Sequence, residues 1–92
     1  MRRAARRDNN ETEIVNALRK AGAYVSFINE PCDLVVGYQG RTILFEVKDG
    51  NKPPSARRLT EREQKFHDSW TGGELYIITC VADALDRLHV KA

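Results

Sequence analysis

The stretch from residue 31 to residue 48 limits the fold more than any other part of the chain. It holds two apolar, β-branched-rich runs on either side of Gly37-Tyr-Gln-Gly40, a pattern that predicts a β-hairpin. Asp33 opens the first strand, and Glu46 and Lys48 close the second. Side chains two apart on a strand point the same way. The hairpin also returns Asp33 beside them, so two carboxylates and an ammonium are predicted to meet at one end of a sheet.

Periodicity, capping signals and turn residues predict the other elements. Asn10 with Glu13 approximates a capping box, and Thr60 with Glu63 is a clear one. The expected elements are a helix from residue 10 to 21 stopped by Gly22, a strand over 23–28, the two hairpin strands, a loop over 49–58, a helix over 60–70 whose Phe66 and Trp70 face the core, a strand over 74–79 and a helix over 81–89. This order predicts an α/β or α+β protein with helices around a mixed sheet.

Length and composition indicate one small domain. The chain has 92 residues, 41% of them hydrophobic, and we expect residues 1–9 to form a basic flexible arm and residues 10–92 a single domain. No apolar run is long enough to span a membrane, and the N-terminus has no apolar signal core. Cys32 and Cys80 lack metal-type spacing, which favours reduced thiols in a cytosolic protein.

Basic side chains gather in two places. Of the 15 Lys and Arg residues, set against 13 Asp and Glu, four lie in the first seven residues, so the rest of the chain is slightly acidic. Basic arms bind phosphate backbones, although a solvated tail or loop explains either group equally well. The candidate DNA-binding residues are Arg2, Arg3, Arg6 and Arg7 of the arm, and Lys52, Arg57 and Arg58 of the long loop.

The charges at the end of the hairpin suit the chemistry of a hard divalent cation. Asp33, Glu46 and the carbonyl of Val47 offer oxygen ligands, with water and substrate phosphate supplying the others. Such an ion polarises a phosphoryl oxygen and activates water, and Lys48 could orient that water. A further acid could come from the first helix, either Glu11 or Glu13, although both also suit the helix dipole. The set predicts phosphodiester hydrolysis, with a structural ion pair as the alternative.

These residues carry a resemblance to a known superfamily. Asp33 followed by Glu46-Val47-Lys48 resembles the PD-(D/E)xK nuclease signature, with Cys32 inserted between Pro31 and Asp33. The resemblance covers roughly residues 9 to 82 and extends to the α-β-β-β-α-β order. An early helix glutamate, D-L-V-x-G and E-V-K are similar to archaeal-type Holliday junction resolvases. The basic loop followed by Leu59-Thr60 and Gln64 is similar to VRR-NUC nucleases, which we favour.

The resemblance implies a restriction-endonuclease-like core and assigns roles. Asp33, Glu46 and the Val47 carbonyl would hold Mg²⁺ or Mn²⁺, with Glu11 rather than Glu13 as the supporting acid. Gln64 would reach the water or the lysine, with plain helix surface as the alternative, while His67 is expected on the surface. The expected function is a metal-dependent endonuclease acting on branched or duplex DNA, forming a homodimer in the cytoplasm of a bacterial or phage-infected cell. A Holliday junction resolvase and a non-catalytic nucleic-acid-binding module remain the alternatives.

Overall fold

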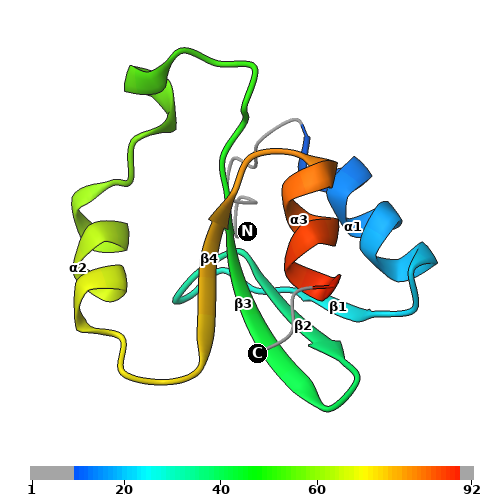
Figure 1. Cartoon of the computed structure of the whole chain (residues 1–92). Helices are drawn as coiled ribbons and strands as arrows, with labels where there is room; N and C mark the ends of the chain where they lie inside the picture. The colour runs from blue at the N-terminus through cyan, green and yellow to red at the C-terminus, as the bar shows by residue number, and fades with distance from the viewer. Residues whose placement is uncertain (1–9, 90–92) are drawn as a thin grey trace, which may run out of the picture.

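A four-stranded mixed sheet with three α-helices forms the part of the chain that the structure, a computed structural model, describes, which is residues 10–89 (Figure 1). The elements are α1 (Glu11–Lys20), β1 (Tyr24–Phe27), β2 (Leu34–Tyr38), β3 (Arg41–Val47), the 3₁₀-helix η1 (Pro54–Arg57), α2 (Glu61–Ser69), β4 (Glu74–Ile78) and α3 (Val81–His89). The predicted α+β class and element order are confirmed. The basic arm predicted over residues 1–9 lies outside the described residues.

The strands lie in sequence order, β1-β2-β3-β4. Strands β1, β2 and β3 are antiparallel neighbours, whereas β4 runs parallel to β3. A parallel neighbour needs a long crossover connection, and the segment from residue 48 to residue 73, which includes η1 and α2, provides it. The carboxyl ends of β3 and β4 therefore meet at one edge, next to the start of β2.

The hydrophobic core lies on the face of the sheet that α1 and α3 cover, while α2 lies on the other side (Figure 1). Alternate residues of the strands point into this core, as Ile43, Phe45 and Val47 of β3 do. The helices contribute the apolar stripe of α1 and two residues of α3; these are Ile14, Val15, Leu18, Ala84 and Leu88. Glu46 alternates with the core residues and so faces the α2 side.

Helix α2 does not bury an apolar face, which corrects the expectation that Phe66 and Trp70 face the core. None of its residues is buried, and Trp70 is 39% exposed. The two rings contact each other at 5.3 Å between centroids, and the Trp70 indole donates to the Gly73 carbonyl. Helix α2 stays outside the core because it carries a single large apolar residue, Phe66. The core face of the sheet is already covered by α1 and α3.

The hairpin turn is tighter than the predicted Gly37–Gly40 segment. Gly37 lies inside β2, paired with Thr42, and the turn consists of Gln39 and Gly40. Their φ angles are 49° and 80°, and positive φ at both central residues matches the twist of the two strands. This turn fixes the register that places Leu34 opposite Phe45. Farther along, the predicted loop also contains a turn of 3₁₀-helix, because two prolines supply the φ that η1 needs.

Asn10 fastens α1 to the sheet rather than capping its own helix. Its side chain makes no cap hydrogen bond, so the predicted capping box with Glu13 is wrong. The Asn10 Nδ2 atom donates instead to the carbonyls of Lys48 at 3.2 Å and Thr79 at 2.9 Å. The ends of β3 and β4 are thereby joined to α1, although the Thr79 carbonyl also accepts the Gly50 N–H at 3.1 Å.

We expect Asn10→Ala to lower the free energy of unfolding by about 2 kcal/mol, because it removes two hydrogen bonds worth about 1 kcal/mol each. Urea unfolding monitored by circular dichroism measures the change. The control is Asn16→Ala, an exposed asparagine on the same helix. Equal stabilities of the two variants would show that Asn10 does not fasten the helix.

Candidate active site

Asp33 is held against the end of β3 by two backbone contacts. Its Oδ2 atom accepts a hydrogen bond from the Val47 N–H at 2.8 Å, and its own N–H donates to the Phe45 carbonyl at 3.2 Å. The register that pairs Leu34 with Phe45 places Asp33 beside Glu46. The structure thus brings together the two acids that the hairpin pattern predicted to meet.

Glu46 is buried among acids. It is 2% exposed, its carboxyl hydrogen-bonds with those of Asp33 and Glu63, and its Oε1 atom is buried without a hydrogen-bond partner. Burial, followed by the contacts with Asp33 and Glu63, raises the pKa of Glu46 to about 9. This carboxyl therefore carries a proton at neutral pH.

Lys48 points across the site to helix α2. Its Nζ atom donates to Glu63 Oε1 at 2.9 Å, and the same oxygen accepts the Thr60 N–H at 2.8 Å. Burial opposes ionisation of Glu63, but the bonds from Lys48 and Thr60 outweigh it and keep the pKa of Glu63 below its ordinary value. Sequence reasoning recognised Glu63 only as a capping residue. Glu63 lies 15 residues after Lys48, on the other side of the basic loop, so no local pattern predicted their contact.

His67 lies inside the site, so the expectation of a surface histidine is wrong. Its side chain is 12% exposed, and its Nε2 atom lies 3.9 Å from Glu46 Oε1. Burial lowers the pKa of His67, which favours the neutral imidazole. His67 follows Glu63 by four residues and so shares its helix face. That spacing was a usable signal once Glu63 was placed at the site.

The remaining predicted site residues divide into inner and outer positions. Glu11 is 3% exposed and follows Asn10, which contacts the Lys48 carbonyl, whereas Glu13 is exposed. Gln64 lies on the exposed side of α2, where its amide donates to Asp68 at 2.8 Å. The structure therefore brings Glu11 inward and does not bring Gln64 to the acids.

The donor set suits a hard divalent cation with few protein ligands. Among residues 10–89, no group of three or more His, Cys, Asp or Glu side chains is arranged to hold a metal ion. Mg²⁺, however, is usually bound by one or two carboxylates, the rest of its shell being water and phosphate. The Val47 N–H points to Asp33, so its carbonyl lies on that side as well. The adjacent carboxyls of half-buried Asp33 and buried Glu46, and the unpartnered Glu46 Oε1, are the features such an ion would satisfy.

A hollow of about 190 Å³ opens next to these acids. Residues before β2 and at the start of α2 line it, namely Asn29, Glu30, Pro31, Cys32, Asp33, Glu46, Thr60, Arg62 and Glu63. The basic loop leads away from Lys48, with Lys52 and Arg58 exposed and Arg57 half-buried. Arg2, Arg3, Arg6 and Arg7 lie outside the described residues.

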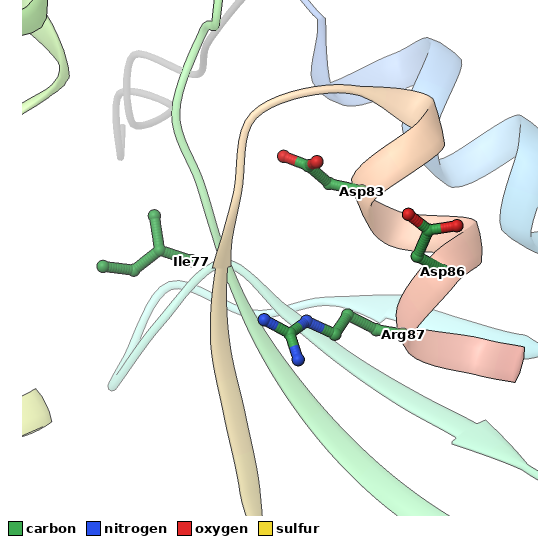
Figure 2. Close-up of a pocket in the computed structure, with 4 residues that line it drawn as sticks. All are labelled: Ile77, Asp83, Asp86 and Arg87. Carbon is green, nitrogen blue, oxygen red and sulfur yellow. The ribbon is translucent and has the colours of Figure 1, made fainter. Parts of the chain in front are cut away.

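A larger cavity of about 340 Å³ lies elsewhere, between β4 and α3. Figure 2 shows Asp83 and Arg87 extending from α3 toward β4. Asp83 accepts hydrogen bonds from the backbone N–H and hydroxyl of Thr79, and the Arg87 guanidinium lies 4.0 Å from the Tyr76 ring centroid. These contacts stabilise the start and the last turn of α3, so we place the candidate active site at the smaller hollow.

Comparison with known proteins gives no match among family models, curated proteins or solved structures. Within residues 10–89, no helix has the length and apolar character needed to cross a membrane. Cys32 and Cys80 are both free thiols, the first buried and the second exposed. Function has therefore to be inferred from the side chains of the site.

We expect the metal-free protein to lose stability as the pH rises from 7 to 9. Folded Glu46 keeps its proton up to about pH 9, whereas the unfolded chain releases it near the ordinary value of 4.5. The contribution of Glu46 to the free energy of unfolding is therefore complete below the unfolded pKa of 4.5. It is lost as the pH rises toward the folded pKa, at up to about 1.4 kcal/mol per pH unit. Below pH 7, His67 acts in the opposite direction, and near pH 9 the buried Cys32 thiol, whose pKa is raised to about 12, adds a slope of the same sign. The change from pH 7 to pH 8 therefore reports mainly on Glu46.

Urea unfolding at pH 7, 8 and 9 in EDTA measures this slope. Glu46→Gln should remove it, since the amide does not titrate. Glu13→Gln, at an exposed position, should keep it. A flat wild-type profile would contradict the protonated state of Glu46.

Proposed function

We propose that this chain is a divalent-metal-dependent DNA endonuclease of the VRR-NUC type that hydrolyses phosphodiester bonds and selects its substrate by structure. The observation that carries the proposal is the pair formed by buried Glu46 and half-buried Asp33, with Lys48 beside it. Burying two carboxylates side by side costs stability unless a proton or a cation lies between them. A module that only binds nucleic acid has no use for such acids facing phosphates.

The proposed roles follow from the positions of the donors. Asp33, Glu46 and the Val47 carbonyl would hold Mg²⁺ or Mn²⁺, with buried Glu11 supporting the ion from α1. When bound, the ion would polarise the phosphoryl oxygen and lower the pKa of water. Glu46 must release its proton before it can act as a ligand. Lys48, an ammonium beside the acids, would orient the attacking water and stabilise the negative charge that develops on the phosphate.

DNA would reach the site along the basic loop. Lys52, Arg57 and Arg58 follow Lys48 in the chain, so phosphates held by the loop would lie near the acids. The arginines of residues 1–9 would add further phosphate contacts. We place the protein in the cytoplasm of a bacterial or phage-infected cell, where its DNA substrate is found.

Pairing of two chains is the second proposal, and exposed apolar side chains favour it. Tyr24 is 71% exposed, Ile77 45%, Phe27 44% and Trp70 39%, which is much apolar surface for a small monomer to leave in water. A two-fold pair would present two sites to one DNA molecule, as cutting of a Holliday junction requires. Cleavage of four-way junctions, flaps and linear duplex, compared at equal concentration, distinguishes the junction resolvase from the general endonuclease.

We expect Asp33→Asn and Glu46→Gln each to lower the rate of plasmid nicking in Mg²⁺ by at least about a hundredfold, because each removes a charged ligand. Circular dichroism should show an unchanged fold, and stability should be equal or slightly higher, since a neutral amide removes the cost of keeping Glu46 protonated beside Asp33. Asp86→Asn, an exposed acid on α3, is the control and should cut normally. Nicking at the wild-type rate by either site variant would remove the active-site assignment.

Sedimentation equilibrium at micromolar concentration tests the pairing. We expect a mass of about twice the 10.5 kDa of the chain. Ile77→Lys, which replaces one of these exposed apolar side chains with a charge, should shift the equilibrium toward the monomer if the β4 edge takes part in the pairing. A wild-type mass of one chain throughout that range would exclude the symmetric mechanism.

A further inference from the structure

Glu63 belongs to two structures at once, the cap of α2 and the surroundings of Lys48. Its Oε1 atom accepts the Lys48 ammonium at 2.9 Å and the Thr60 N–H at 2.8 Å. We infer that Glu63 is a positioning residue, which holds the Lys48 ammonium beside the Asp33 and Glu46 carboxyls and fixes the start of α2 over the site. The inference rests on the proposed function, in which Lys48 acts on the phosphate.

Lys48 needs such an anchor because its side chain is long and flexible. A lysine stem has four rotatable carbons, and fixing it costs side-chain entropy. The Lys48 side chain is 13% exposed and that of Glu63 is 24% exposed, so water screens their attraction only in part. The partner atom is itself fixed, because the Thr60 backbone and the first turn of α2 hold the carboxylate in one orientation.

The same contact positions the basic loop. Lys48 and Glu63 are 15 residues apart, and the segment between them contains Lys52, Arg57 and Arg58. Helix α2 buries no residue, so apolar packing does little to hold its first turn against the sheet. The Lys48–Glu63 pair, together with the ion pair between Arg62 and Glu30, closes this segment on the site. Phosphates bound by the loop are thereby kept at a fixed distance from the acids.

A glutamate in this position could also serve the helix alone. In a capping box, glutamine replaces glutamate without loss of the backbone hydrogen bond. Glu63→Gln therefore keeps the cap and removes the charge that holds the ammonium, which separates the two roles. Glu61→Gln is the matched control, with the same change of charge at an exposed position in the same helical turn.

The test combines steady-state cleavage of a duplex or flap DNA in Mg²⁺ with NMR of the lysine ammonium groups in the DNA-free protein. For Glu63→Gln we expect kcat to fall about tenfold or more, a KM within about threefold of wild type, a melting temperature lowered by a few degrees at most and loss of the Lys48 ammonium signal. Glu61→Gln should match wild type in all four. Thr60→Ala, which breaks the cap from the other side, should lower the melting temperature and keep the signal.

A Glu63→Gln protein with wild-type kcat and an intact ammonium signal would show that Glu63 only caps α2. A wild-type protein that cuts no DNA would instead contradict the proposed nuclease function. In that case the NMR comparison still decides whether Glu63 holds Lys48: loss of the signal in Glu63→Gln supports the contact, and its persistence overturns it.

Discussion

The burial of Glu46 beside Asp33 is the interaction on which the rest of the site depends. β3 alternates core residues with outward-facing ones, and Glu46 takes an outward position where α2 covers it. The cost of crowding two acids there is reduced in this structure by a proton, which the raised pKa of Glu46 reflects. The neighbouring residues offset the remaining negative charge. The Val47 N–H donates to Asp33, Lys48 supplies a positive charge, and Glu63 holds Lys48.

The sequence predicted the parts of the fold that local patterns determine. The strands, the stop at Gly22 and the box of Thr60 and Glu63 depend on neighbouring residues, and all are present. The hairpin also placed Asp33 next to Glu46, because register alone fixes that contact. The predictions that failed concern contacts with residues far away in the sequence. The Asn10 amide prefers two strand-end carbonyls to its own helix, and such a choice leaves no trace in the pattern around it.

Helix α2 shows the same limit at the site. Its sequence predicts a helix correctly, but the face it turns to the acids depends on how the crossover positions it. The prediction placed Gln64 at the site and His67 on the surface, whereas Glu63 and His67 face Glu46 and Gln64 bonds to Asp68. With little apolar content, α2 has no hydrophobic stripe from which its rotation could be predicted.

Two helices begin near the acids, and this explains why the site tolerates so much negative charge. Asn10, at the start of α1, contacts the Lys48 carbonyl, and Thr60, at the start of α2, lines the hollow beside Asp33. The amino end of a helix carries partial positive charge, which favours anions nearby. In the proposed function, the amino ends of α1 and α2 would also favour a phosphate of the DNA. Crowded carboxylates and an incoming polyanion are compatible in one site because helix termini, Lys48 and a divalent cation would share the compensation.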